Sequence, residues 1–357
     1  MKIETLLPLG RLDPGLRAAS VPLDIAAVAS DARRAEGLGY DGVLAAETKD
    51  DPYIVMALAA EATSRVGLAT AVAIAFPRSP MVTALSAWTL QKLSHGRFTL
   101  GLGSQVKGHI ERRYGLAWSA PGPWLREYVQ ALRAIWACWQ NGTKLDFESE
   151  HYKLSLMVPL FAPAPIEHPH IPVELAAVNP YMCQVAGEVA DGIRAHPIAT
   201  PRYIAEVMLP AARRGAAKAG RDLGQFTMCA MPLVATAETH AGLAERISEV
   251  RARVAFYAST PAYLLAFESE GYGDVARALQ GHARAQRWAE MPGLVGDEML
   301  DAYAVIGTYD EIAAKLRARY APLATSLEFA IPLSGAGDEA RLRGLIDSLR
   351  IGRAATR

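Results

Sequence analysis

The chain has 357 residues, of which 51% are apolar and 21% are charged, a composition typical of a folded globular protein and incompatible with wholesale disorder. Its 37 basic residues balance 37 acidic residues, so charge gives no sign of a nucleic-acid or anionic-membrane partner. The longest stretch without Asp, Glu, Lys or Arg, 223–237, is shorter than the ~20 apolar residues that a membrane span needs. Three widely spaced cysteines favour a reduced, cytoplasmic protein without a disulfide framework.

Short apolar runs alternate with amphipathic helices along the whole chain. The expected strands are 3–9, 42–47, 66–74, 98–103, 173–178, 192–196, 227–235 and 327–332. The expected helices are 24–38, 53–64, 80–93, 124–140, 180–190, 201–215, 238–257 and 338–349. A proline-rich loop with a short hairpin interrupts the rhythm at 141–172, and an insertion of short helices fills 259–303.

Eight such units indicate parallel strands that are buried on both faces. We therefore expect an α/β fold, a (β/α)8 TIM barrel with a helical insertion before its last strand, forming a single domain over 1–357. A doubly wound open sheet is the alternative. In a barrel, functional residues belong to the loops that follow the carboxyl ends of the strands.

Several of these strand ends carry chemically suggestive residues. Glu47 could orient a reacting group or act as acid or base, or it could be a solvated charge at the rim. Gly103 could let a flat ring or a phosphate approach the backbone, or simply make a tight turn. Asn179 begins a helix whose N-terminus could bind an anion, or it could serve only as a cap. His196 is a candidate substrate contact.

Arg194 lies within the sixth expected strand, where an unpaired charge would be costly. It could reach a phosphate, but we favour a structural ion-pair network with an acidic residue of another strand. The candidate partners are Glu4, Glu174 and Glu328.

The sequence has no clear metal or hydrolase signature. His168 and His170 have metal-like spacing but no further ligands nearby, so we expect no metal site. No Gly-x-Ser-x-Gly elbow occurs, so nothing in the sequence supports a serine hydrolase.

Taken together, five loose motifs in a fixed order resemble the luciferase-like monooxygenase superfamily. They occupy 35–43 ahead of Glu47, 93–103, 146–152, 186–192 and 305–312. Members of this superfamily are (β/α)8 barrels that bind FMN or the deazaflavin coenzyme F420. Within the insertion, 255–263 and 297–302 resemble the F420-dependent oxidoreductase branch, which is similar to methylenetetrahydromethanopterin reductases. The resemblance therefore implies F420 as the cofactor, with FMN as the alternative.

Carried over by position, the resemblance implies a non-proline cis peptide at Ala71-Val72 beneath the cofactor ring. His109 would be a polar contact and would join Glu47 near the reacting centre. The implied cofactor contacts are Thr48, Ala71, Val72, Ala73, Gly103, Ser104, Ala177, Val178 and Asn179. His196, Tyr257 and Tyr263 are weaker candidates for the substrate wall.

Two positions depart from the pattern of the superfamily. Thr48 stands where several alcohol-oxidising relatives carry His, and Val178-Asn179 replaces a common glycine pair. Because the base for an alcohol is missing, we expect hydride transfer with a small organic substrate, such as reduction of a C=C or C=N bond. The alternatives are an FMN-dependent monooxygenase and a cofactor-binding protein without turnover. Relatives are often dimers, so we expect a homodimer.

Overall fold

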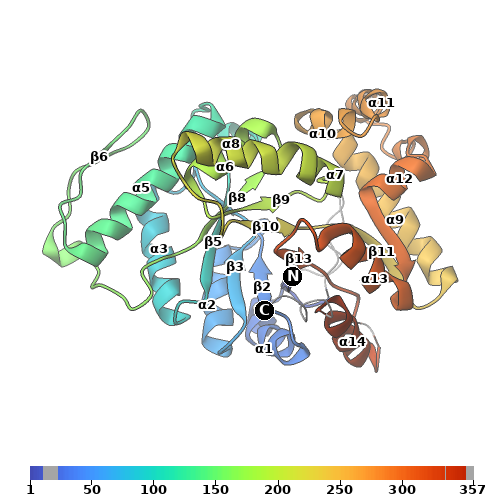
Figure 1. Cartoon of the computed structure of the whole chain (residues 1–357), viewed down its shortest axis with the longest axis horizontal. Coiled ribbons are helices and arrows are strands. Elements are labelled where there is room, and N and C mark those ends of the chain that lie inside the picture. Colours follow the sequence, from blue (N-terminus) through green and yellow to red (C-terminus); the bar gives the residue numbers. More distant parts are fainter. Residues whose placement is uncertain (11–22, 334, 351–357) are drawn as a thin grey trace.

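The computed structural model describes residues 1–10, 23–333 and 335–350. Within these residues, parallel strands form a closed ring surrounded by helices, which is the expected (β/α)8 barrel (Figure 1). β3 and β4 follow one another at a single position of the ring, and pairing of β3 with β5 closes it. The barrel strands are β1 (Lys2–Leu6), β2 (Gly42–Ala45), β3 (Gly67–Thr70), β4 (Ala73–Ile74), β5 (Phe98–Gly103), β8 (Val173–Ala177), β9 (Gly192–Ala195), β10 (Thr227–Ala230) and β13 (Ser326–Glu328).

Three of the helices around the barrel, α2, α3 and α6, begin at capping residues that the sequence places before a proline. Asp51, Ser79 and Asn179 each accept a backbone N–H at a helix start, and each is followed by a proline at the first helical position. The helices that accompany the barrel are α1 (Val28–Leu38), α2 (Pro52–Ala62), α3 (Pro80–Leu93), α5 (Pro121–Asn141), α6 (Pro180–Val189), α7 (Pro201–Tyr203), α8 (Leu209–Lys218), α9 (His240–Ala258), α13 (Tyr309–Tyr320) and α14 (Asp338–Arg350).

Apolar side chains fill two regions. The larger core lies between the strands and the surrounding helices and includes the fully buried Trp88, Phe98 and Tyr128. A smaller cluster contains Leu44 and Ala69, strand residues outside the main core. This division is expected for parallel strands that are covered on both faces.

The expected seventh strand, 227–235, is wrong beyond Ala230. Instead, β10 ends there, and a separate strand, β11 (Leu233–Ala237), leaves the ring to pair with β12 (Ala304–Thr308). An uninterrupted apolar run does not show where one buried strand ends and the next begins. The last barrel strand also differs, since it covers Ser326–Glu328 rather than 327–332, and neither β12 nor α13 was expected as an element.

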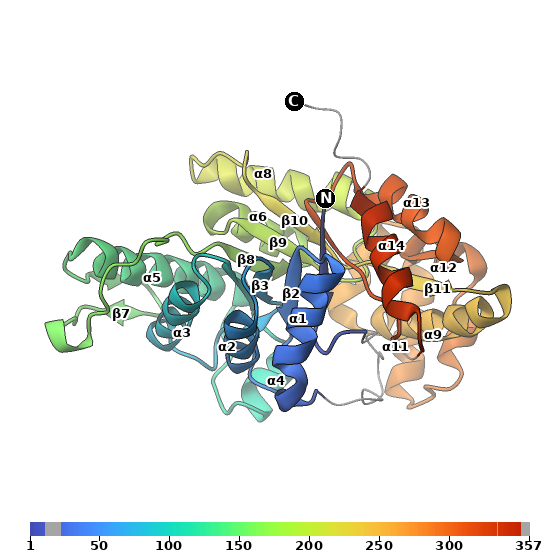
Figure 2. The ribbon, with the colours of Figure 1, turned by 90° about the horizontal axis from the view of Figure 1, so that it is seen from below.

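Two additions extend the barrel in opposite directions. The segment 259–303 holds α10 (Leu264–Glu268), α11 (Gly273–Arg284) and α12 (Asp297–Tyr303), which gather beside α9 (Figure 1). A hairpin of β6 (Phe147–Glu148) and β7 (Lys153–Leu154) projects from the other end, as the view in Figure 2 also shows. In the described residues, no helix is both long and apolar enough to cross a membrane.

Candidate active site

The loop between β3 and β4 has the non-proline cis peptide that the resemblance to the superfamily implied. It is the Ala71-Val72 peptide bond. Just before it, the Thr70 hydroxyl donates to the Gly101 carbonyl (2.7 Å) and accepts the Gly101 N–H (2.9 Å), which ties β3 to β5. A Cβ atom at Gly101 would lie 2.0 Å from the Thr70 carbonyl oxygen, so only glycine allows this approach.

The end of β5 lies against this loop. A Cβ atom at Gly103 would lie 2.7 Å from the Val72 Cγ2 atom, and Ile74 is the strand partner of Gly103. Ala71 belongs to the smaller apolar cluster and Val72 is half-buried, whereas Ala73 and Ala177 are buried in the larger core. Ala71 and Val72, together with Gly103, therefore form a small apolar floor at the carboxyl end of the barrel, at the position expected beneath a flat ring.

Glu47 is held in place next to this floor. Its Oε2 atom accepts the Ile74 N–H (2.7 Å), and both carboxylate oxygens accept from the Arg78 Nη1 atom (2.9 and 2.8 Å). The Glu47 backbone N–H also reaches the Val72 carbonyl (3.4 Å). Only 10% of the Glu47 side chain is exposed, so Glu47 is not a solvated charge at the rim, which was the alternative to a chemical role. That chemical role stays a prediction.

Arg78 was not singled out by the sequence, yet it links the residues around the floor. Its second amino group binds Asp51 (2.9 Å), the cap of α2, and its guanidinium lies 5.2 Å from the ring centroid of Tyr53. Burial would lower the pKa of Arg78, but the hydrogen bond and charge of Glu47 outweigh burial and raise it. Arg78 therefore stays charged and joins the loops after β2 and β4.

The loop after β5 leads to the other predicted polar contact. Gln105 follows Ser104 with a φ of 57°, the left-handed region, and α4 (Lys107–Arg112) begins two residues later. His109 lies on this helix, exposed to solvent, and Thr48 is exposed as well. Arg113 at the end of α4 donates to the Thr48 carbonyl (3.2 Å), so α4 is tied to the loop after β2. The structure thus places His109 at a solvent-exposed position of a helix that is tied to the loop after β2.

The loop after β8 forms the start of α6. The Asn179 side chain accepts the Met182 N–H (2.9 Å), so it is engaged as the helix cap. Tyr203 donates to the Val178 carbonyl (2.9 Å), which fixes this loop from the next unit of the barrel. The first turn of α6 presents the positive end of the helix dipole at the carboxyl face, where the sequence predicted an anion site.

The three predicted substrate-side residues come together from separate elements. The ring of His196, just after β9, lies 4.7 Å from the ring of Tyr257 on α9 and 4.4 Å from the ring of Tyr263 in the insertion. The His196 Nδ1 atom accepts the Ile198 N–H (3.4 Å), which ties the ring to the loop after β9. The insertion therefore contributes directly to the surroundings of the barrel mouth.

Arg194 belongs to the opposite end of the barrel. It binds Glu4 (3.1 Å) and Glu174 (2.7 Å), which is the structural network favoured above over a phosphate contact. Burial would lower the pKa of Arg194, but the charges of Glu174 and Glu4 raise it. A cavity of about 750 Å³ borders these side chains at the amino end of the strands, away from the predicted site.

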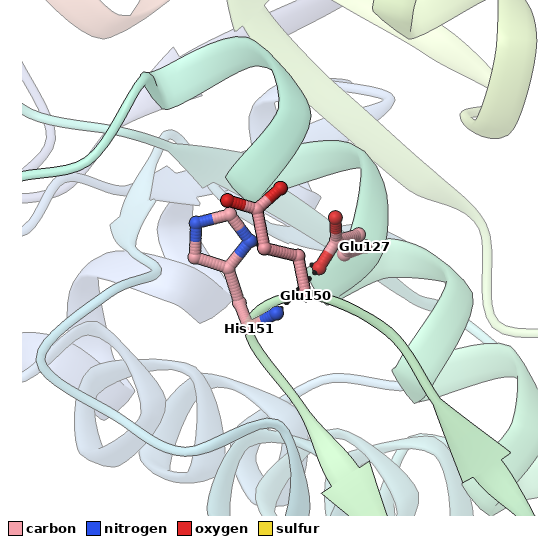
Figure 3. A group of neighbouring side chains, drawn as sticks. All are labelled: Glu127, Glu150 and His151. Carbon is pink, nitrogen blue, oxygen red and sulfur yellow. Dashed lines mark hydrogen bonds and ion pairs between the residues drawn. The ribbon is translucent and has the colours of Figure 1, made fainter.

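One cluster of polar side chains was missed altogether. Where the 147–154 hairpin meets α5, potential ligand atoms of Glu127, Glu150 and His151 lie within 4.8 Å of one another (Figure 3). The His151 Nδ1 atom already contacts Glu127 (2.9 Å), and its Nε2 atom contacts the Ser119 hydroxyl (2.8 Å). No sequence spacing connects these residues, because a helix and a hairpin bring them together.

Comparisons with known proteins agree with this architecture. A family profile described as luciferase-like monooxygenase matches residues 2–326. An uncharacterized protein of Mycobacterium tuberculosis is 45% identical over 84% of this chain and 88% of its own length. A 5,10-methylenetetrahydromethanopterin reductase of Methanolobus tindarius is 29% identical, with 83% and 87% covered.

A solved structure supports the fold independently. The coenzyme F420-dependent tetrahydromethanopterin reductase of Methanopyrus kandleri superposes with a TM-score of 0.74 at 20% identity, covering 98% of both chains. The barrel, the order of its motifs and the matched family profile lead to one conclusion: the chain belongs to the luciferase-like monooxygenase family.

Proposed function

We propose that this protein is an oxidoreductase that transfers a hydride between coenzyme F420 and a small organic substrate. The observation that carries the proposal is the apolar floor at the carboxyl end of the barrel, where Val72 meets Gly103 beside the Ala71-Val72 peptide. A relative and a structural neighbour named as methanopterin reductases support a hydride-transfer reaction. The motifs at 255–263 and 297–302 favour F420 over FMN.

The residues present fit a flat cofactor ring. Val72 and Ala71 offer apolar contact from below, and the absence of a side chain at Gly103 leaves room for the Val72 side chain to take this position. When bound, F420 would supply the hydride chemistry. The contribution of the chain is to orient the ring and exclude water. Glu47 and Arg78 fix the segment after Val72. Because this segment carries the floor beneath the cofactor ring, we place Glu47 beside the reacting centre.

Polar groups around the floor fit the rest of the cofactor. The first turn of α6 after Asn179 would bind a phosphate through backbone N–H groups, assisted by the dipole of the helix. Thr48 and Ser104 lie on the loops after β2 and β5, His109 lies on α4, and the three would contact the ring edge and the side chain of the cofactor. Exposure of Thr48 and His109 leaves both available to a ligand.

The substrate would lie against His196, Tyr257 and Tyr263. Their packed rings form an aromatic wall that suits a small organic molecule, and His196 is a potential proton donor when its ring carries a second proton. Reduction of a C=C or C=N bond needs a hydride and a proton, and a donor of this kind would supply the proton. Thr48 in place of a histidine disfavours an alcohol substrate.

An FMN-dependent monooxygenase is the second candidate, favoured by the description of the matched family. Fluorescence titration of the purified protein with F420 and FMN separates the two functions, followed by a screen of acceptors with the cofactor that binds more tightly. Tighter binding of F420 and acceptor-dependent oxidation of its reduced form are expected. Preference for FMN with oxygen consumption would favour the monooxygenase, and retention of either cofactor without turnover would favour a binding protein.

A homodimer is proposed from the outer surface of α2 and α3. These neighbouring helices expose apolar side chains, including Ile54 (58% exposed) and Val82 (51% exposed), as well as Leu85. Helices that are apolar on several faces are normally covered. Ile54→Glu combined with Leu85→Glu should shift light-scattering mass from dimer to monomer, whereas Leu265→Glu on α10 should not. A wild-type monomer would contradict the proposal.

A further inference from the structure

Ser119, His151 and Glu127 form a hydrogen-bonded series that the proposed hydride transfer does not use. The Ser119 Oγ atom lies 2.8 Å from the His151 Nε2 atom, and the His151 Nδ1 atom lies 2.9 Å from the Glu127 Oε2 atom. Both contacts have the length of good hydrogen bonds. A hydroxyl, an imidazole and a carboxylate in this order are the arrangement that activates a serine nucleophile.

The imidazole is fixed in the orientation that this chemistry requires. Glu127 accepts both the ring and the backbone N–H of His151. The ring of Trp124 stacks on His151 with centroids 5.5 Å apart, and it also stacks on Phe76 at 3.7 Å. Held in this way, His151 carries its proton on Nδ1 and presents the Nε2 lone pair to the Ser119 hydroxyl.

The carboxylate is suited to the role of orienting partner. Burial would raise the pKa of Glu127, but hydrogen bonds from the His151 backbone, from Ser149 and from the His151 ring lower it below the ordinary value. Glu127 is therefore ionised at neutral pH and stabilises an imidazolium when the ring takes up a proton. Glu150 adds a third potential metal ligand (Figure 3), but a metal at His151 would have to replace the proton shared with Glu127.

We infer that Ser119 is an activated nucleophile that accepts acyl groups from small carboxylic esters. The Oγ atom forms a bond to the ester carbonyl carbon while its proton moves to His151 Nε2. The bond from carbonyl carbon to alkoxy oxygen then breaks, and the leaving alcohol takes the proton from His151. Water attacks the acyl-serine by the same route, releases the acid and restores the hydroxyl.

The position of Ser119 limits the substrates that it can use. Ser119 is half-buried and precedes α5 by two residues, so negative charge on the carbonyl oxygen would develop near the positive end of a long helix dipole. Pro121 and Pro123 have no amide hydrogen, which leaves few backbone donors in this first turn. Esters with good leaving groups fit such a site better than amides.

The test uses the full-length protein and an alkyl fluorophosphonate, which forms a phosphorus–oxygen bond to an activated serine and releases fluoride. Mass spectrometry of digested protein should locate the adduct at Ser119, at a rate at least about 100-fold above that of His151→Gln, the typical contribution of a general base. Glu127→Gln should slow labelling at least about tenfold. Ser155→Ala, which removes an exposed serine near the same hairpin, should label like the wild type.

A second probe covers the case in which a substitution disturbs the hairpin. In Ser119→Cys, the thiol should react with iodoacetamide at least about tenfold faster than in Ser119→Cys combined with His151→Gln. Hydrolysis of p-nitrophenyl acetate should depend on Ser119 in the same way. Absence of a Ser119 adduct, equal rates in Ser119→Ala and wild type, or thiol reactivity that is independent of His151 would overturn the inference.

Discussion

Replacing Glu47 by Gln tests the part of the site on which the placement of the cofactor depends. The substitution keeps the size of the side chain but removes the charge that binds Arg78 and weakens the acceptor of the Ile74 N–H. A hydrogen bond to a charged group is worth about 2 kcal/mol, and Glu47 is mostly shielded from solvent. We expect unfolding to become easier by about this amount.

The loss is measurable by thermal unfolding. Unfolding entropy of about 2.1 cal/mol/K per residue over 357 residues converts 2 kcal/mol into a fall in Tm of about 3 °C. Asp51→Asn is the matched control, because Asp51 binds the same Arg78 from a more exposed position and its loss should cost less than about 1 kcal/mol. An unchanged Tm in Glu47→Gln would refute the stabilising role assigned to the ion pair.

Turnover and cofactor binding separate a chemical role from a structural one. If Glu47 acts beside the reacting centre, oxidation of reduced F420 by the best acceptor of a screen should fall at least about 100-fold. The Kd for F420 should change by less than about tenfold, since the floor itself is retained. A folded variant that keeps more than about half of the wild-type rate would show that Glu47 has no part in the chemistry.

Three further substitutions test the supporting structure. Gly101→Ala places a Cβ atom 2.0 Å from the Thr70 carbonyl oxygen and should lower the free energy of unfolding in urea by about 3 kcal/mol. Gly37→Ala, which has open space around the new Cβ atom, should not lower it. Equal stabilities of the two variants would contradict the close approach of the strands. Arg194→Met leaves two buried carboxylates without their partner and should cost about 3 to 5 kcal/mol, and a cost below about 1 kcal/mol would contradict the network. Burial would raise the pKa of Glu36, but hydrogen bonds from the backbone N–H groups of 64–66 lower it. The ionised Glu36 therefore stabilises the folded protein above the unfolded pKa of about 4.3, and this stabilisation is lost as pH falls through the lower folded pKa. Glu36→Gln should destabilise the protein at pH 7 much more than in strong acid, and a pH-independent difference would argue against this linkage.

Much of the barrel could be predicted because each unit carries local signals. The pair Asn179-Pro180 predicted the start of a helix, and the structure confirms Asn179 as its cap. Motif residues that made the family recognisable also act in the fold, since Asp41 accepts the Ile3 N–H and Asp191 accepts the Val173 N–H at the start of neighbouring strands. Each of these hydrogen bonds joins one strand to the segment just before the next strand. The two partners are therefore one unit apart in the sequence, and the acidic residue belongs to a local motif.

The parts that were missed depend on contacts between distant segments. Arg78 follows the third strand without any motif, and only the folded chain brings it to Glu47 and Asp51. Ser119 and His151 meet because the hairpin folds back on the segment that leads into α5, a contact that neither periodicity nor spacing predicts. The division of 227–235 into β10 and β11 likewise depends on β12, which lies about 70 residues further along the chain.

The central claim is that the mouth of this barrel binds a deazaflavin. Parallel fluorescence titrations of the wild-type protein with F420 and with FMN test it most directly, with Gly103→Leu as a variant whose side chain would displace that of Val72. We predict that F420 binds more tightly than FMN and that Gly103→Leu weakens F420 binding at least about tenfold while the protein stays folded. Equal or inverted affinities for the two cofactors, or F420 binding that is unaffected by Gly103→Leu, would contradict the account.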